Sequence, residues 1–353
     1  MRISKGSKDF LLYDEEKQIY YIDDEQKVVD EVEKDHWKIV IRNLLKDWRL
    51  YLMLVPMLFV FFCWRYLPMY ELLGAFKINL DGSIKVADYF YLGYNNFDTI
   101  LFGSYQNSFW NAFRNTFILS FYGLLFGFPM PILIALFFNE IKSKLYRSVL
   151  QVMTYLPKFI STVIITTLVW FLLSNKNQLE ANAQPGIVAR VLAMLGLVSE
   201  QEAASGIMYE VQYFRPVYIL TGIWEGAGYG SIVYFAAIIA ISPTSYEAAQ
   251  IDGAGKMAQM RYVVLPSILS TIVIMLIVRI GSLLSIGYET VLLLQANGTM
   301  VNAQVVSTFA IKLKEDGAFH LATIPELLNN LTSMILVIGA NMISRKATDT
   351  SLY

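Results

Sequence analysis

Histidine and cysteine are almost absent from this sequence of 353 residues, which contains two histidines and a single cysteine. His36 and His320 each stand alone and Cys63 lies within an apolar run, so we expect no metal site, no imidazole proton relay and no intramolecular disulfide. Charge is scarce as well. Charged residues make up 16% of the chain, and a formal net charge of −1 gives no reason to expect nucleic-acid binding.

Motifs for nucleotide and hydrolytic chemistry are also missing. No H-E-x-x-H occurs, and the run nearest to a phosphate-binding loop, Gly253-Ala254-Gly255-Lys256, lacks both the first glycine and the hydroxyl after the lysine. The glycine-rich run from Gly226 to Gly230 falls inside an apolar segment, where close helix packing or a kink is expected. We therefore predict that the chain is not an enzyme and binds no cofactor, so that any energy source must come from a partner.

Apolar residues dominate the composition. They make up 56% of the chain, and the mean hydropathy is +0.46, as in proteins that cross a membrane several times. A bilayer core needs about 20 apolar residues of helix. Six runs supply them: Leu50 to Tyr70, Thr116 to Phe138, about Val149 to Leu173 with Lys158 after Pro157 as its one interruption, about Pro216 to Ile241, about Tyr262 to Tyr288, and Leu327 to Ser344. We predict an all-α membrane protein with six transmembrane helices.

Lysine and arginine near the ends of these runs all fall on one side of the predicted membrane: Lys38, Arg42, Lys46, Arg49, Lys142, Lys144, Arg147, Lys256, Arg261, Arg345 and Lys346. Such an excess marks the cytoplasmic side. We therefore expect both termini and the central polar loop to be cytoplasmic. The predicted organisation is an N-terminal tail (1–48), a transmembrane domain (49–346) and a C-terminal tail (347–353).

The first 35 residues or so are polar and acidic. Two short apolar runs on either side of Asp23-Asp24-Glu25-Gln26 fit a small hairpin, but an isolated hairpin is marginal, so we expect a solvated tail. The first twenty residues have no apolar core, and no cleaved signal peptide is expected.

The central polar loop, 242–266, separates two long apolar runs. Ser242 followed by Pro243 is a favourable start for a helix, and Thr244 with Glu247 three residues later fits a capping box. Gly253 and Gly255 are expected to end this helix. A short helix with small alanines on its surface, held between membrane spans, is typical of a docking element.

Ionisable residues inside the predicted spans require an explanation, because they are costly in a bilayer and normally face the bundle interior or a wet cavity. Glu225, Arg279 and Glu289 are three such residues. In one interpretation they line a polar translocation path together with Trp224, Tyr288 and Asn297, where charged groups bind sugar hydroxyls and aromatic rings stack on sugars. In the other, Arg279 pairs with a carboxylate to stabilise the bundle, and the glutamates lie near the membrane surface.

The central loop resembles the EAA loop of the permease subunits of binding-protein-dependent ABC importers. The resemblance rests on Glu247-Ala248-Ala249, on Gly253 six residues after the glutamate, and on Leu265-Pro266; Lys256 to Met260 stand where that family often has an aromatic residue. It implies that the loop contacts an ATPase subunit through these residues: Glu247, Ala248, Ala249, Asp252, Gly253, Ala254, Gly255, Leu265 and Pro266.

Further motifs resemble the subgroup that imports oligosaccharides derived from complex polysaccharides: Trp48 to Tyr51, Tyr66 to Tyr70, Arg114-Asn115-Thr116, Tyr213 to Pro216, and Ile286 to Glu289. The resemblance covers roughly residues 40 to 353. It implies a MetI-like fold in the bacterial cell membrane, a heterodimer with a second permease, an ATPase dimer that binds ATP and Mg, and an extracytoplasmic solute-binding protein.

Three alternatives stay open at this point. The chain could be a permease of the same fold for a peptide, an amino acid or a glycerol phosphate, although one arginine among two glutamates does not make a strongly basic cavity. It could be a secondary transporter, which would need no docking helix. It could also be a membrane sensor that couples to an ATPase without transporting.

Overall fold

The computed structural model describes residues 11–14, 19–22, 46, 48–76, 95–174 and 185–348, and the chain divides into two units, residues 1–70 and 71–353. In the first unit, strand β1 (Leu11–Asp14) pairs antiparallel with strand β2 (Ile19–Ile22). A hairpin does form, but it pairs the run before β2 with β2 and not the two runs on either side of Asp23–Gln26. The run before β2 is the better partner because it places Tyr13 opposite Tyr20, an aromatic cross-strand pair. The rest of the predicted tail lies outside the described residues.

The first predicted span is helical. Helix α2 (Trp48–Phe61) continues into the π-helix η1 (Phe62–Tyr66) and the 3-10 helix η2 (Leu67–Phe76). Residues 48–70 are long and apolar enough to cross a membrane, and none of them is buried within the chain. A helix that is apolar on all sides and buries nothing within its own chain is suited to lipid or to a partner.

All regular elements described in the second unit are helical. In chain order they are α3 (Asn95–Leu101), α4 (Gln106–Tyr122), the π-helix η4 (Gly123–Gly127), α5 (Pro129–Glu140), α6 (Lys144–Tyr155), η5 (Leu156–Phe159), α7 (Thr162–Leu173), α8 (Ile187–Met194), α9 (Glu200–Ser205), η6 (Ile207–Tyr209), α10 (Phe214–Ile239), α11 (Pro243–Ile251), α12 (Lys256–Gln259), the π-helix η7 (Met260–Val264), α13 (Leu265–Ser267), α14 (Leu269–Gly281), α15 (Tyr288–Leu294), η8 (Asn297–Thr299), α16 (Met300–Ala303), α17 (Val306–Glu315) and α18 (Phe319–Thr348).

Within the described residues, three helices are long and apolar enough to cross a membrane by themselves, and the number rises to six if each of three bent pairs is one span. The third predicted span is not one straight helix: its halves, Lys144–Phe159 and Thr162–Leu173, meet at 100°. Pro157 removes a backbone donor there, and Ile160 and Ser161 are extended. The fifth predicted span is bent by 61° and ends at Gly281 rather than Tyr288.

Helix α10 lies at the centre of the second unit, where it packs against α5, α6, η4, α15 and α16. Gly228 permits the closest of these approaches. A Cβ at Gly228 would lie 2.0 Å from the carbonyl oxygen of Thr154 in α6, so only glycine fits. The close packing expected from the glycine-rich run is confirmed at this residue.

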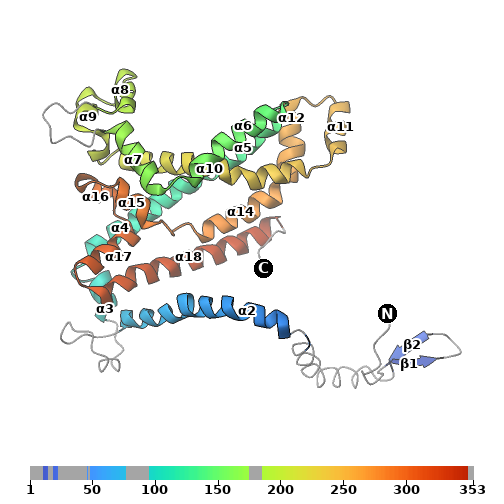
Figure 1. The fold of residues 1–353 in the computed structure, drawn as a ribbon, viewed down its shortest axis with the longest axis horizontal. Helices are drawn as coiled ribbons and strands as arrows, with labels where there is room; N and C mark the ends of the chain where they lie inside the picture. Colours follow the sequence, from blue (N-terminus) through green and yellow to red (C-terminus); the bar gives the residue numbers. More distant parts are fainter. Residues whose placement is uncertain are drawn as a thin grey trace. The chain divides into compact units, whose positions relative to one another are not determined.

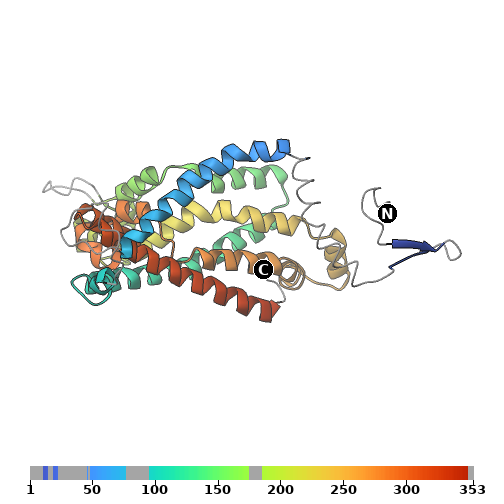
Figure 2. The same ribbon diagram turned by 90° about the horizontal axis from the view of Figure 1, so that it is seen from below.

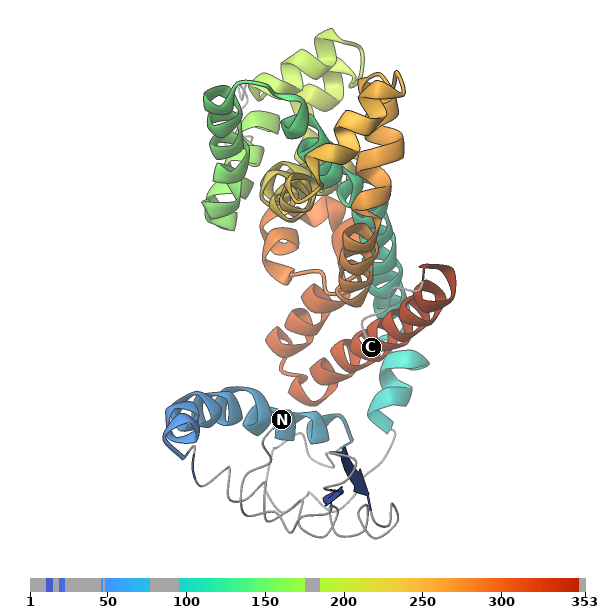
Figure 3. The same cartoon turned by 90° about the vertical axis from the view of Figure 1, so that its right-hand side faces the viewer.

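The ends of the second unit differ. Figures 1 and 2 show α11 at one end, where α5 and α18 also finish, and show α15, α16 and α17 toward the other end. Figure 3 views the unit from the α11 end, with α10 seen nearly along its axis. The loop into α6, with Lys142 and Lys144, begins where α5 ends, and Lys256 forms an ion pair with Glu140 at the end of α5. Lys142, Lys144 and Lys256 therefore lie at the same end of the second unit.

Candidate coupling loop and translocation path

Helix α11 starts where the sequence predicted, with Ser242 as its N-cap and Pro243 as its first residue. The expected capping box between Thr244 and Glu247 is wrong, because Thr244 lies inside the helix and no side chain caps it. The hydroxyl oxygens of Ser242 and Thr244 lie 2.7 Å apart instead. Measured from Ser242, the third residue is Ser245 rather than a glutamate, and no side-chain cap hydrogen bond forms.

The C-terminal end of α11 is a Schellman motif centred on Gly253. The Gly253 N–H donates to the carbonyl of Gln250 (3.0 Å), and the Ala254 N–H donates to the carbonyl of Ala249 (2.8 Å). Gly253 adopts the left-handed conformation that this motif requires, with φ +79°. Its predicted role in ending α11 is confirmed. Gly255 has φ −69° and is the N-cap of α12, so its expected part in ending α11 is wrong.

Helix α11 has one anchored side and one bare side. Tyr246 and Ala249 are half-buried, and Tyr246 packs against a core cluster from α5, α10 and η7. Glu247 and Ala248 are exposed on the other side. Ile251 belongs to that side too, four residues after Glu247, and it is 87% exposed. The bare side therefore combines a carboxylate, a small residue and a large apolar residue, a combination suited to protein contact.

The segment after α11 is held firmly against the bundle. Lys256 pairs with Glu140, the Gln259 amide donates to the carbonyl of Ala254 at 2.8 Å, and Leu265 is half-buried in the same cluster as Tyr246. Asp252 and Pro266 are exposed. The predicted coupling residues thus lie on one rigid, partly exposed loop.

Glu225 is not a free carboxylate. Its Oε1 atom lies 2.8 Å from the Lys158 ammonium, and the two side chains are 18% and 46% exposed. Lys158 lies in η5, at the break in the third span, and sequence reasoning treated it only as an interruption. Pairing with Lys158 removes most of the negative charge that Glu225 would otherwise bring to a translocation path.

Arg279 lies in α14 on the side of α4 and α10. Its Nη2 atom is 3.8 Å from the place that a Cβ on Gly123, at the start of η4, would occupy, and α14 packs against α10. Among the described residues, no hydrogen bond or ion pair joins its guanidinium to another group. The stabilising ion pair considered from the sequence is therefore not found in the described part of the chain.

Arg215 belongs to a polar network that joins α4, α10 and α16. Its Nη2 atom donates to the side-chain oxygens of Asn115 and Asn302, each at 3.0 Å. The Asn115 amide donates in turn to the carbonyls of Val301 (2.8 Å) and Gln304 (3.1 Å). Asn115 and Arg215 lie in motifs that carried the family resemblance, but sequence reasoning gave neither a role and did not place them together.

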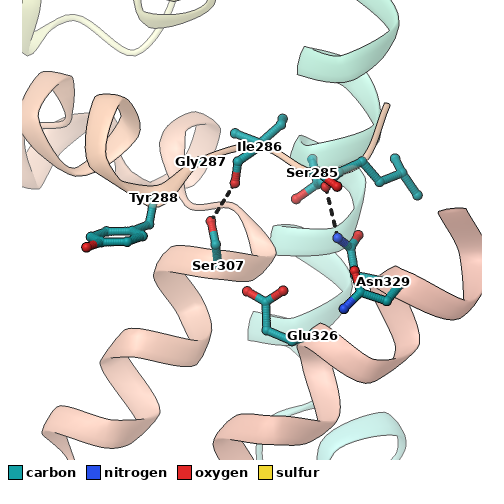
Figure 4. Close-up of a pocket in the computed structure, with 10 residues that line it drawn as sticks. Ser285, Ile286, Gly287, Tyr288, Ser307, Glu326 and Asn329 are labelled. Atoms are coloured by element: carbon teal, nitrogen blue, oxygen red, sulfur yellow. Dashed lines mark hydrogen bonds between the residues drawn. The ribbon is translucent and has the colours of Figure 1, made fainter. Parts of the chain in front are cut away.

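A cavity of about 230 Å³ lies where the chain is irregular between α14 and α15 (Figure 4). Tyr288 lines it, together with Ser285, Ser307, Glu326 and Asn329. The Ser307 hydroxyl donates to the carbonyl of Ile286 (3.0 Å), and the Asn329 amide donates to the carbonyl of Leu284 (2.9 Å). Of the predicted path residues only Tyr288 lines this cavity; Trp224, Glu289 and Asn297 are exposed elsewhere.

Helix α9 is fixed to the start of α10 by Glu202. This carboxylate completes a capping box with Ser199, accepts a hydrogen bond from the Tyr213 hydroxyl at 3.2 Å and another from the Gln212 amide. The hydrogen bonds from Ser199 are the main cause that lowers the pKa of Glu202.

Comparisons with known proteins bear on these features. Residues 127–341 match the family described as "Binding-protein-dependent transport system inner membrane component". Two proteins of Bacillus subtilis (strain 168) are each 32% identical to the chain: Protein LplB, over 88% of this chain and 92% of that protein, and the polygalacturonan/rhamnogalacturonan transport system permease protein YteP, over 91% and 95%. The crystal structure of a bacterial alginate ABC transporter in complex with an alginate pentasaccharide-bound periplasmic protein is 37% identical, with a TM-score of 0.75 over 88% of this chain and 99% of that one. The matched region contains α10 to α16 and thus α11, Glu225 and Arg279.

Proposed function

Because the chain belongs to the family of binding-protein-dependent transport system inner membrane components, we propose that α11 is the contact through which a separate ATPase drives it. The chain is a permease component of an ABC importer that carries oligosaccharides across a membrane. The observation that supports the coupling role is the bare side of α11, which projects from a loop that is otherwise anchored to the bundle.

The proposed orientation places α11 in the cytoplasm of a bacterium, with both termini on the same side. Lys142, Lys144 and Lys256, which lie at the α11 end of the second unit, support this orientation, because lysine and arginine are enriched on the cytoplasmic side. An ATPase that uses cytoplasmic ATP and Mg could then reach Ile251. The opposite end of the unit, with α15 to α17, would face the solute-binding protein.

The proposed assembly contains a second permease subunit, two ATP-binding subunits and an extracytoplasmic solute-binding protein. A periplasmic protein with bound alginate pentasaccharide is present in the similar crystal structure, which supports the last of these partners. The sequence has no phosphate-binding loop, which fits an ATPase on a separate chain. We assign no catalytic step to this chain.

The proposed mechanism is alternating access. ATP binding closes the ATPase subunits and moves α11, and because α11 is anchored to the cluster around Tyr246, that motion passes to α5 and α10. The bundle then opens toward the binding protein, and hydrolysis returns it to the inward-open state. The ATPase shifts this equilibrium only by its different affinity for the two states.

Ile251 provides a direct test of the contact. Ile251→Asp should weaken ATPase binding by about 10- to 100-fold, because burying an isoleucine side chain contributes about 1.5–3 kcal/mol. Gln250→Asp is the matched control, since it places the same charge one residue earlier on an exposed flank. Binding is measured by titrating the ATPase onto the permease heterodimer in nanodiscs. Equal binding by the two variants would contradict the proposed contact.

A further inference from the structure

Arg279 is a cation inside a predicted span with no counter-charge of its own. An arginine carries five N–H donors, and none of those of Arg279 is paired within the described residues. An unpaired arginine in a bilayer is costly and is found mainly where it faces a wet cavity or a substrate path. The Arg279 side chain is exposed in this chain, so a group from outside the chain can reach its donors.

The surroundings of Arg279 place it beside one face of α10. Arg215, Tyr218, Gly222 and Glu225 follow one another at spacings of three, four and three residues, so they share that face. Helix α14 packs against α10, and the glycine at the start of η4 leaves room for the Arg279 guanidinium. A polar stripe thus runs along α10 with the free guanidinium next to it.

The charge along this stripe is positive. Its one carboxylate, Glu225, is paired with Lys158. Arg215 is held by two neutral amide oxygens, its Nε atom is buried without a partner, and the charge of Arg114 acts on it from α4. No carboxylate within the described residues forms an ion pair with any of these arginines.

The remaining acidic residues near the α14–α15 break do not alter this balance. Glu289 is exposed in the first turn of α15. Glu326 lines the cavity next to Tyr288. Neither makes an ion pair with Arg279.

Building on the proposed function, we propose that Arg279 binds a carboxylate of the passing substrate, and that this substrate is an acidic oligosaccharide containing uronic acids. The planar guanidinium can hold a carboxylate with two parallel hydrogen bonds, a geometry that a lysine cannot reproduce. A neutral sugar would leave the charge of Arg279 uncompensated in the membrane. Arg215 and its amide partners present a second guanidinium along the same face.

The test uses the complete importer in proteoliposomes, with both permeases, the ATPase and the binding protein. Short oligogalacturonate and oligomannuronate are tried first, and the one that the wild-type importer takes up faster is the acidic probe. The neutral probe is that same oligomer with every carboxyl group methyl-esterified. We expect Arg279→Gln to reduce ATP-driven uptake of the acid by about 10- to 100-fold, which corresponds to the loss of a charged hydrogen-bond pair. Uptake of the ester should not change.

The comparison is made between variant and wild type with the same binding protein, so the preference of that protein cancels. Arg190→Gln, which removes an exposed arginine in α8, is the control and should leave both uptakes unchanged. Arg279→Lys should also lower uptake of the acid selectively. If the glutamine variant does not assemble with the second permease, the lysine variant is used for the comparison in its place.

Two results would overturn the inference. One is an equal loss of acid and ester uptake in the Arg279 variants, which would mean that the residue stabilises the assembly. The other is wild-type uptake of the ester at least as fast as uptake of the acid. The proposed function fails separately, if no oligosaccharide, acidic or neutral, is taken up in an ATP-dependent manner.

Discussion

Replacing Gly253 by alanine tests whether the backbone conformation at the end of α11 matters for ATPase binding, because alanine adds only a methyl group. No atom of the described chain lies within 4 Å of the position that the new Cβ would take, so the substitution adds no clash. Gly253 has φ +79°, and a non-glycine residue in that conformation costs roughly 1–2 kcal/mol. Gly255 is equally open but has φ −69°, so Gly255→Ala is a control with the same added methyl and no backbone strain.

The strain acts on the Schellman motif that ends α11. If the ATPase binds only the properly ended helix, its apparent affinity falls with the fraction of permease that retains that end. A cost of 1–2 kcal/mol corresponds to about a 5- to 30-fold change in that equilibrium. We therefore expect Gly253→Ala to raise the Kd of the ATPase for the permease heterodimer by up to this factor, and Gly255→Ala to leave it unchanged.

The assay is the same nanodisc titration, together with ATP-driven uptake by the full importer. Recovery of the second permease with each variant shows that membrane insertion and assembly are intact. If both alanine variants bound the ATPase as tightly as the wild type, the end of α11 would have no part in the contact, and the coupling role of Gly253 would be refuted.

Three further predictions concern the bundle. Gly228→Ala places a methyl group against the α6 backbone and should lower the melting temperature, since overpacking costs about 1–3 kcal/mol. Gly226→Ala, in open space on the same helix, should leave it unchanged or raise it, and equal melting temperatures would refute the close approach. Lys158→Met leaves Glu225 unpaired and should destabilise the protein by about 0.2–1 kcal/mol, because the pair is partly exposed, whereas adding Glu225→Gln should restore most of the loss; additive losses in unfolding experiments would show that the pair does not interact. The pKa of Glu202 is lowered, so its stabilisation of α9 is present above the unfolded-state pKa and is lost as the pH falls through the folded-state pKa. The protection factors of the α9 amides, which are corrected for the intrinsic pH dependence of exchange, should fall on acidification over that range in the wild type and not in Glu202→Gln, and an identical pH dependence would contradict the assignment.

The helical runs could be predicted from the sequence because membrane spans have a strong signal in composition and length. The break in the third span was only partly readable. Pro157 marks the place, but the 100° angle depends on the extended residues after it and on their packing. The hairpin was placed too late in the chain because apolar pattern alone does not select between neighbouring partners for β2.

The coupling loop was predicted better at its end than at its start. Gly253 could be identified because few residues other than glycine end a helix with a positive φ. The predicted capping box was wrong because the chain uses Ser242 rather than Thr244 as the N-cap; both are good N-caps, and the sequence does not show which one the chain uses. Ile251 was missed, although its signal was available: it is a large apolar residue at helical spacing from Glu247 on a helix surrounded by polar residues.

The translocation path shows where sequence reasoning must fail. One arginine and two glutamates suggest a path with no preference for anions, and that was the conclusion from the sequence. The count is misleading because Glu225 pairs with Lys158, 67 residues away in the sequence. No carboxylate of the described residues forms an ion pair with Arg279, and the partner that we propose for its charge is the substrate. The preference for acidic sugars therefore depends on which charges the fold brings together rather than on how many the spans contain.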